Sequence, residues 1–391
     1  MKVALVHDYL WEFGGAERVL EALHEIFPQA PIFTAYYNLD KLGPHKNRIK
    51  NWDLRSSWLQ NFPFASKFIS PSRIFAKKIF ESFDLSSFDV VISSCNTYFA
   101  KAVLTKPSQL HISYIHTPPR YLYGYTTSFN YKKHMLTRIG GEILNHFLRI
   151  WDFEVSQRPS ILVANSKNVQ ERIKKFYRRD SLVIYPPVDI SSFPRKRESN
   201  RSPIRTLATL KTLQPSVVKS GMTDKGEYFL SLGRLVRGKG TEIAVAAATK
   251  LNLPLKVAGV GPQMDELKAF AGKNVEFLGE VTDEERVSLL SNAKALIVSS
   301  EDEDFGITVV EAFASGTPVI AVKAGGYLET MINGKTGEFF KEAKVEELVK
   351  VLEKFDQDKY SSSFLRKHAE KFSKNKFKKE VLELVNENIK S

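Results

Sequence analysis

The fold is decided by residues 295–322, which read ALIVSSEDEDFGITVVEAFASGTPVIAV. The stretch begins and ends with a short apolar run, 295–298 and 319–322. Between these runs lie an acidic loop and then an apolar segment of helical length. A strand, a helix and a second strand in this order predict a parallel βαβ unit. Ligands of parallel sheets bind beyond the carboxyl ends of the strands, so the loop at 299–306 is the first candidate site.

Similar strand-like runs separated by helix-length segments fill the chain in two series. The expected strands are 3–7, 32–36, 90–94, 112–115, 161–164 and 182–185, followed after a break by 228–232, 255–258, 275–278, 295–298 and 319–322. We therefore predict an α/β fold with two Rossmann-like parallel-sheet domains that face each other across a cleft. The predicted boundaries are 1–190 for the first domain, 191–226 for a basic low-complexity linker or insertion, 227–370 for the second domain, and 371–391 for a C-terminal helix that packs back on the first domain.

The composition is that of an ordinary globular protein. Of 391 residues 43% are hydrophobic and 26% are charged, which excludes a mostly disordered chain and a disulfide scaffold. The single cysteine, Cys95, has no partner within the chain for a disulfide, which favours a reducing compartment. No run stays apolar for the roughly 18 residues that a membrane span needs, so we expect a cytoplasmic protein without signal peptide or transmembrane helix.

The net charge of +13 comes from two windows of the sequence. Residues 41–82 carry +7 and mix lysines with aromatic and aliphatic side chains, a pattern that suits contact with an anionic membrane surface. Core helices with a solvated basic face are the alternative. Residues 194–225 carry +6 without interleaved aromatic residues, so we interpret them as a tether and expect no nucleic-acid binding, which is the competing hypothesis.

A cationic, glycine-rich loop follows the expected strand 228–232. It reads GRLVRGKGT and nearly matches a P-loop, but Gly240 stands where a P-loop carries its magnesium-binding hydroxyl. Arg234 and Lys239 next to a helix N-terminus suit a diphosphate that carries no metal. A solvated basic loop is the alternative. Two further glycine turns are less specific: Gly14 and Gly15 open a helix after the first strand, and Gly261 lies in a tight turn after strand 255–258.

Carboxylates and histidines supply the remaining candidates. Glu303 and Glu311 lie at the two ends of the segment that joins the acidic loop to its helix, an arrangement that can bind the hydroxyl groups of two sugars. Asp302 and Asp304 form a D-x-D pair, which leaves metal binding and a purely structural acidic helix start as alternatives; we expect no metal. His116 ends the strand 112–115, and His7 and Asp8 end the first strand, where catalytic and structural roles both remain open.

Together these motifs resemble the retaining GT-B glycosyltransferases of family 4, over nearly the whole chain except residues 194–225. The most specific element is the E-x7-E pattern from Glu303 to Glu311, which is followed by GTPV at 316–319 and preceded by Arg234 and Lys239 at the family's spacing. The segments VHDY at 6–9, GGAE at 14–17 and IHTPPRY at 115–121 are similar to a narrower subgroup. That subgroup contains the mannosyltransferases of bacterial O-antigen and exopolysaccharide chains.

The resemblance implies a role for each matching residue. On the donor side, Arg234 and Lys239 would hold the diphosphate and stabilise it as leaving group, Glu303 would contact the hexose and Glu311 the ribose. Phe305, Gly306 and Ile307 would contribute backbone amides to the donor site. The remaining donor-binding residues would be Gly14, Gly15 and Gly261. His116 would lie near the reacting carbon, so the implied catalytic set is His116, Arg234, Lys239 and Glu303. The acceptor-side candidates are His7, Asp8, Arg120 and Tyr121. Asp304 departs from the family pattern, since most members have glycine there.

The implied function is transfer of a hexose, mannose from GDP-mannose, to a lipid-linked saccharide in O-antigen or exopolysaccharide biosynthesis. No cofactor is expected, because fixed cations and helix amides can offset the negative charge that develops on the departing phosphate. We expect the protein at the inner face of the cytoplasmic membrane, held there by residues 41–82. The alternatives are a UDP-sugar-dependent glycosyltransferase and a nucleotide-sugar-binding protein without turnover.

Overall fold

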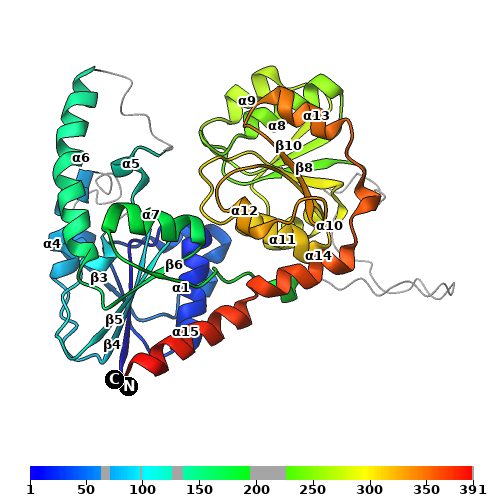
Figure 1. The fold of residues 1–391 in the computed structure, drawn as a ribbon. Helices are drawn as coiled ribbons and strands as arrows, with labels where there is room; N and C mark the ends of the chain where they lie inside the picture. Colours follow the sequence, from blue (N-terminus) through cyan, green and yellow to red (C-terminus); the bar gives the residue numbers. More distant parts are fainter. Residues whose placement is uncertain (63–70, 97–98, 126–134, 194–225, 390–391) are drawn as a thin grey trace, which may run out of the picture.

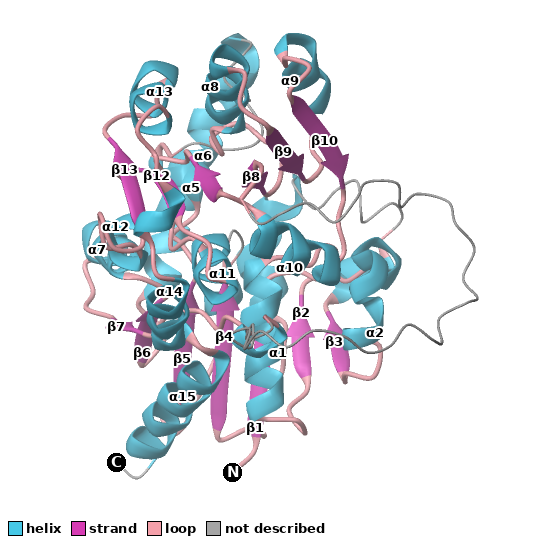
Figure 2. Ribbon diagram, turned by 90° about the vertical axis from the view of Figure 1, so that its right-hand side faces the viewer, coloured by secondary structure: helices cyan, strands magenta, loops and turns pink. Residues whose placement is uncertain are grey.

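A computed structural model describes residues 1–62, 71–96, 99–125, 135–193 and 226–389. It confirms the predicted fold class: two α/β domains, each built on a parallel sheet with helices on both faces (Figures 1 and 2). The basic stretch 194–225 lies outside the described residues. No helix in the described ranges is both long enough and apolar enough to cross a membrane.

The first domain contains a seven-stranded parallel sheet in the order β3-β2-β1-β4-β5-β6-β7. Its strands are β1 (Val3–His7), β2 (Ile32–Thr34), β3 (Leu54–Ser56), β4 (Val90–Cys95), β5 (Leu110–Ile115), β6 (Ile161–Ala164) and β7 (Leu182–Val183). Its helices are α1 (Gly15–Ile26), α2 (Lys46–Ile49), α4 (Ala76–Glu81), α5 (Arg120–Tyr123), α6 (Met135–Ser156) and α7 (Lys167–Tyr177). Short 3₁₀ turns are η1 (Leu39–His45), η2 (Trp58–Asn61), η3 (Pro71–Phe75), η4 (Ala100–Ala102) and η6 (Ile190–Ser192).

The second domain contains a six-stranded parallel sheet in the order β10-β9-β8-β11-β12-β13. Its strands are β8 (Phe229–Leu232), β9 (Leu255–Ala258), β10 (Val275–Gly279), β11 (Ala295–Val298), β12 (Val319–Val322) and β13 (Gly337–Phe340). Its helices are α8 (Thr241–Leu251), α9 (Met264–Phe270), α10 (Asp283–Asn292), α11 (Ile307–Ser315), α12 (Tyr327–Thr330), α13 (Val345–Leu352) and α14 (Ser362–Ala369), with η7 (Gln357–Lys359) and η8 (Glu370–Phe372).

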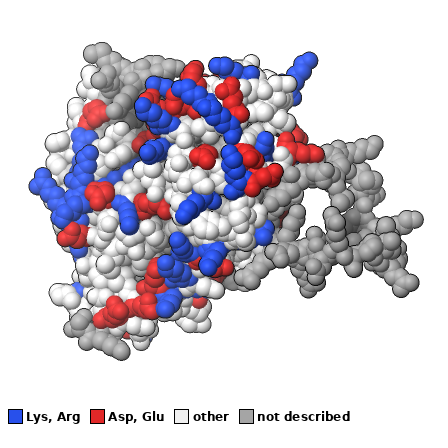
Figure 3. All heavy atoms as spheres, turned by 45° about the vertical axis from the view of Figure 1, so that its right-hand side comes forward, with Lys and Arg blue, Asp and Glu red and all other residues white. Residues whose placement is uncertain are grey.

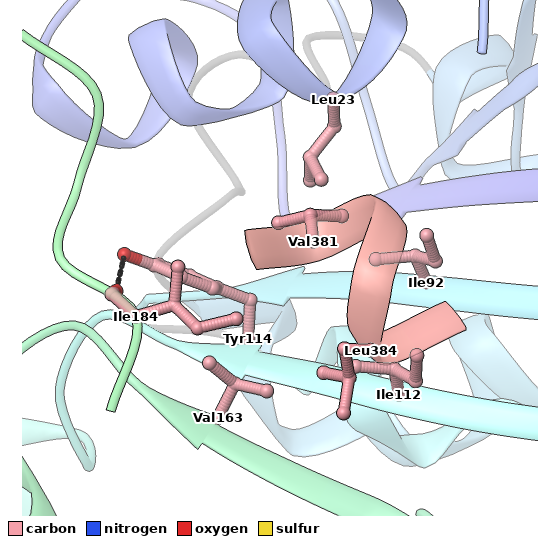
Figure 4. Close-up of a pocket in the computed structure, with 8 residues that line it drawn as sticks. All are labelled: Leu23, Ile92, Ile112, Tyr114, Val163, Ile184, Val381 and Leu384. Atoms are coloured by element: carbon pink, nitrogen blue, oxygen red, sulfur yellow. Dashed lines mark hydrogen bonds between the residues drawn. The ribbon is translucent and has the colours of Figure 1, made fainter. Parts of the chain in front are cut away.

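The last helix, α15 (Lys374–Ile389), leaves the second domain and packs on the first (Figure 1). Its buried side chains join the core formed by α1 and the first sheet; they are Phe377, Val381, Leu384 and Val385. Figure 4 shows Val381 and Leu384 beside Leu23, Ile92 and Ile112. These side chains line an apolar void of about 10 Å³. Lys374 and Lys378 both pair with Glu25 of α1, at 2.9 and 2.6 Å. The chain thus links its two domains a second time.

Both sheets reverse their strand order near the middle, between β1 and β4 and between β8 and β11. Such a reversal opens a crevice at the carboxyl ends of the strands. The loops after β1, β8 and β11 lie at these crevices, and contacts between domains join them. Arg234 lies 3.4 Å from Glu12, and a Cβ atom on Gly15 would lie 2.9 Å from the Ile307 side chain. The two crevices therefore face each other.

Candidate active site

The cationic loop after β8 brings two of the predicted residues to the cleft. The Lys239 ammonium donates a 2.8 Å hydrogen bond to Oε2 of Glu303 in the loop after β11. The Arg234 guanidinium is 64% exposed and lies 3.4 Å from Glu12 of the first domain. Lys239 and Glu303 therefore form one unit, with Arg234 projecting into the space beside it.

Glu303 is ionised at neutral pH. Burial acts to raise the pKa of Glu303, but the Lys239 ammonium, assisted by Arg120 and Arg234, outweighs burial and holds the pKa below its usual range. An ionised carboxylate accepts hydrogen bonds and donates none. Glu303 is therefore equipped to bind the hydroxyl groups of a sugar.

Gly240 explains why the loop departs from a P-loop. It is the N-cap residue of α8 with φ +71°, and a Cβ atom there would lie 2.5 Å from the backbone oxygen of Ser299. A hydroxyl-bearing side chain has no room at this position, so the loop cannot supply a magnesium ligand there. The first backbone amides of α8 nevertheless remain an anion-binding element next to Lys239.

The acidic loop reaches α11 through a tightly packed turn. The Phe305 ring is buried against Tyr185 and Phe372, with ring centroids 5.5 and 5.4 Å away. Gly306 is the N-cap of α11 with φ +90°, and a Cβ atom there would lie 3.1 Å from the Tyr327 ring. The Phe305 side chain thus anchors the turn, while the turn and Ile307 present the amides that begin a nine-residue helix.

Glu311 lies one turn further into α11 and is almost fully buried. Its Oε2 accepts from Arg286 of α10 at 3.3 Å, and Arg286 also binds Asp283 at 2.7 Å. Asp283 is at the same time bound by Arg18 and Arg48 of the first domain, each at 3.0 Å. Burial would raise the pKa of Asp283, but Arg18 and Arg286 lower it to about 2. Sequence reasoning missed these arginines, because charged residues on separate helices form no local motif.

The glycines of the prediction lie at two different places. The Gly14 amide donates to the Glu17 carboxylate at 2.8 Å, and Gly15 begins α1. Since Gly15 meets Ile307, the N-termini of α1 and α11 approach each other across the cleft. Gly261 lies behind the cationic loop, where a Cβ atom would clash with the backbone of Leu235. Glycine is therefore required at position 261 for the close packing of these two loops.

The predicted histidines share one buried hydrogen-bonded row at the carboxyl ends of β1, β4 and β5. Glu17 Oε1 lies 3.4 Å from Nε2 of His7, and Nδ1 of His7 lies 3.1 Å from the Ser94 hydroxyl. The same hydroxyl lies 2.8 Å from Nε2 of His116. Burial, with a contribution from His7, lowers the pKa of His116 to about 3, so this ring is neutral at physiological pH. Ser94 and Glu17 complete a row that sequence analysis recognised only in part.

This low pKa predicts a pH-dependent stability. Burial also lowers the pKa of His111 to about 3, so below about pH 6.5 the unfolded chain binds protons at His111 and His116 that the native protein does not. The stabilisation is complete above about pH 6.5 and is lost as the pH falls toward 3, by about 1.4 kcal/mol per pH unit for each ring. We expect denaturant titrations between about pH 7 and pH 5 to show this decline, and His116→Asn to make it shallower by about half. Equal slopes in both proteins would contradict the assignment.

Arg120 forms part of a clamp between the domains. Its guanidinium donates to Oδ2 of Asp304 at 2.7 Å and to the Asp302 carbonyl at 2.6 Å. Arg172 of α7 binds the other oxygen of Asp304 at 2.7 Å, and Ser166 donates to the Asp304 carbonyl at 2.6 Å. The structure therefore places Arg120 between the domains, and its acceptor-side assignment stays a prediction.

Other acceptor-side candidates also have partners within the protein. Asp8 accepts backbone amides of Asn96 and Ala100, at 2.7 and 3.0 Å, and so holds the loop after β4. The Arg73 guanidinium lies over the Tyr121 ring, 4.5 Å from the centroid of that ring. Both residues lie at the predicted carboxyl edge of the sheet, and their acceptor-side assignment stays a prediction.

The D-x-D alternative is disfavoured by these contacts. Both carboxylate oxygens of Asp304 bind arginines, which occupy the positions that a cation would take. Within the described ranges no group of three or more histidine, cysteine or acidic side chains is arranged to hold a metal ion. A metal-independent reaction stays a prediction.

Comparison with known proteins finds a family match within the second domain and relatives of similar sequence. Residues 215–379 match the family model described as glycosyl transferases group 1. The chain is 28% identical over 199 residues to the alpha-1,3/1,6-mannosyltransferase ALG2 of Dictyostelium discoideum, a match that covers 44% of this chain and 46% of that protein, which is less than half of its length. It is 25% identical over 397 residues to the alg2 protein of the same description from Schizosaccharomyces pombe, covering 86% of this chain and 70% of that protein.

A solved structure shares the fold over the whole length. The crystal structure of Anabaena HepE in complex with UDP-glucose superposes with a TM-score of 0.68 and 16% sequence identity, covering 99% of this chain and 100% of that chain. The family match lies on the domain that carries Arg234, Lys239, Glu303 and Glu311, and the two facing parallel sheets confirm the predicted architecture. The second domain therefore matches the group 1 glycosyltransferases, and the chain as a whole has the GT-B fold.

Proposed function

We propose that this protein transfers a hexose from a nucleotide sugar to a saccharide acceptor. The observation that carries the proposal is the Lys239–Glu303 ion pair at the carboxyl edge of the second sheet, with Arg234 beside it. Because Lys239 and Glu303 are in contact, a phosphate bound by the lysine and a hexose bound by the carboxylate would lie next to each other. The N-termini of α8 and α11 add amides on the same edge.

In this proposal the chemistry is stabilisation of a leaving group. Cleavage of the bond between sugar and phosphate leaves negative charge on the diphosphate, and Lys239 and Arg234 offset that charge. The hexose, bound through its hydroxyls by Glu303, remains in place for the acceptor. Arg286 and Glu311 would bind the ribose end, with Glu311 as hydrogen-bond acceptor. His116, neutral and buried, would act by packing and hydrogen bonding near the sugar and not as a charged acid.

We propose mannose from GDP-mannose as the donor. Support comes from the alpha-1,3/1,6-mannosyltransferases among the relatives, at 25–28% identity, and from the subgroup resemblance. A UDP-sugar donor is the second candidate, since the Anabaena neighbour was solved with UDP-glucose. A nucleotide-sugar-binding protein without turnover is the third, and a transfer assay separates it from the other two.

The proposed acceptor is a lipid-linked saccharide at the inner face of the cytoplasmic membrane, in O-antigen or exopolysaccharide biosynthesis. Within the basic window 41–82, the side chains of Trp58, Phe62, Ile74 and Phe75 are exposed. Leu59, Ile79 and Phe80 of that window are buried, so the core-helix alternative accounts for part of it. The exposed aromatic residues support contact with a membrane surface.

Nucleic-acid binding remains the competing hypothesis from another class of function. The stretch 194–225 on which it rests lies outside the described residues. On the face shown in Figure 3, basic and acidic side chains are interspersed, unlike the basic stripe typical of nucleic-acid-binding proteins. We propose that the protein acts without nucleic acid.

The donor is tested by thermal unfolding with GDP, GDP-mannose, UDP, UDP-glucose and ADP. A ligand at about a hundredfold excess over its dissociation constant stabilises the native protein by roughly 2.7 kcal/mol, enough to raise the unfolding midpoint by several degrees. We expect stabilisation by GDP and GDP-mannose only, and its loss in Glu311→Ala. Stabilisation by uridine ligands would replace the proposed donor, and no stabilisation by any of the five would contradict a donor site in this cleft.

A further inference from the structure

Helix α6 exposes a stripe of large apolar side chains, while its buried side is partly polar. Six large apolar side chains between 38% and 58% exposed form an outer stripe at helical spacing, defined here as the α6 apolar face: Ile139, Ile143, Leu144, Phe147, Ile150 and Phe153. The inward side carries the buried polar residues Asn145, Asp152 and Ser156 together with the buried apolar residues Leu148 and Val155. A surface helix of a water-soluble domain normally keeps most of its large apolar side chains on the buried side. An exposed apolar stripe of this size indicates an interaction surface.

The polar groups on the inward side of α6 have hydrogen-bond and ion-pair partners, so the observed orientation of α6 is the stable one. Asp152 accepts from Lys101 at 2.6 Å and from the Tyr123 hydroxyl at 2.8 Å, and the side chains of Lys101 and Asp152 are both fully buried. Rotating α6 to bury its apolar face would break this ion pair and leave two charges without partners in the core. The apolar face is therefore held outward by the fold itself.

A second element extends this face with positive charge. Ile74 and Phe75 of η3 are exposed beside α4, and α4 is joined to α6 by an ion pair from Lys77 to Glu154 at 2.8 Å. In Figure 1, α4 and α6 lie on the side of the first domain away from the second. Lys78 of α4 is exposed as well. The part of the basic window 41–82 that adjoins α6 is therefore the segment formed by η3 and α4.

Charge at this border favours an anionic partner. In the described parts of η3, α4 and α6, the acidic side chains at the surface are ion-paired: Glu154 with Lys77, Glu142 with Arg149 at 4.0 Å, and Glu81 with Arg158 at 2.6 Å. Lys78 adds positive charge to this neutralised border. An apolar stripe with a basic border matches the acyl and headgroup layers of an anionic leaflet. A symmetric pair of copies would instead place one basic border against another.

We propose that the α6 apolar face, together with Ile74 and Phe75, docks on the surface of an anionic lipid bilayer, with α6 lying in the interface. This inference rests on the proposed function, because a lipid-linked acceptor is the reason for a membrane to lie near the protein. Helix α5 connects the two places: Arg120 binds Asp304 in the cleft, and the Leu122 carbonyl accepts from Arg149 of α6 at 3.1 Å. Helix α5 therefore connects the docked helix mechanically to the cleft in which the acceptor would react.

The test is co-sedimentation of the full chain with vesicles of phosphatidylglycerol and phosphatidylethanolamine, and with phosphatidylcholine vesicles for comparison. We expect binding to the anionic vesicles that weakens at high salt. The double variant Ile143→Glu, Phe147→Glu should lower the bound fraction by about tenfold or more, because charges on the inserted face oppose insertion. The matched control is Phe270→Glu, Leu382→Glu, which places the same charges on exposed apolar positions of α9 and α15 and should bind as the wild type does.

Two results would overturn the inference. One is a failure of the variants to differ: either the α6 variant still binds vesicles, or the control loses binding to the same extent. The other is a dimer in sedimentation equilibrium that only the α6 variant dissociates, without vesicle binding, which would assign the face to a second copy. Stabilisation by nucleotide is measured on the same proteins. If vesicles bind through α6 but no nucleotide stabilises the protein, the proposed function fails and the docking surface stands.

Discussion

Replacing Lys239 with alanine is expected to lower kcat for sugar transfer by about 10² to 10³ while the protein stays folded, the range found when one preorganised donor to a developing charge is removed. The Lys239 ammonium is fixed by its 2.8 Å contact with Glu303 and is one third exposed, so it can reach a phosphate without reorganising the core. The substitution also removes the main cation that lowers the pKa of Glu303. The measurement is single-turnover transfer with saturating donor, because saturation separates loss of chemistry from loss of binding.

The matched control for this experiment is Lys250→Ala. Lys250 is exposed and lies in the last turn of α8, so its substitution removes the same charge at the end of the helix far from the Lys239 loop. We expect the control to retain wild-type transfer. Glu303→Gln is the companion variant, since glutamine keeps the shape and removes the charge. A Lys239→Ala protein with undiminished transfer, or a control that loses as much, would show that the ion pair does not lie at the reacting centre.

Replacing Asp304 with alanine is expected to lower the free energy of unfolding by about 2 to 4 kcal/mol, somewhat less than removal of a partner from a fully buried ion pair. Asp304 binds Arg120 and Arg172, both at 2.7 Å, and the Arg172 side chain is only 6% exposed. Without the carboxylate, Arg172 remains as a nearly buried cation without its acidic partner, and the domains lose a charged contact. The measurement is thermal unfolding, with an expected decrease of several degrees. Small-angle scattering should show a larger radius of gyration as the cleft loosens.

Glu301→Gln is the control for Asp304, because it removes one charge from an exposed position of the same loop. It should leave both the midpoint and the radius of gyration unchanged. The variant Asp304→Gly, which restores the residue most members of the resembled family have, should behave like the alanine variant in stability. Unchanged unfolding in Asp304→Ala would mean that the clamp contributes nothing to the closed arrangement.

The sequence predicted the central strands of both sheets and missed strands at the edges. Central strands such as β1, β4 and β11 are buried throughout, so each begins with an apolar run that the sequence reveals. The edge strands β3 and β13 escaped prediction. β3 has only three residues, is partly exposed and contains Arg55, so no apolar run marks it. Strand β13 is bounded by glycine and includes the charged Glu338.

For the site, the sequence identified the residues that lie on one short stretch. The segment from Glu303 to Glu311 and the pair Arg234 and Lys239 were recognisable because loop, helix start and spacing are local. Their meeting across the sheet, 2.8 Å between Lys239 and Glu303, follows from the adjacency of β8 and β11, which local spacing does not contain. The arginines that bind Asp283 and Asp304 come from helices of the other domain.

By itself, then, the sequence determined the fold class, the two-domain order and the donor-side motifs, because periodicity, glycine placement and charge are properties of neighbouring residues. Only the tertiary structure decided that Arg120 clamps the domains, that His116 is buried and neutral, and that α6 turns its apolar face outward. Each depends on residues far apart in the chain, such as Lys101 and Asp152, whose desolvation and pairing fix which side of a helix is buried. That pairing free energy exists only after the chain has folded.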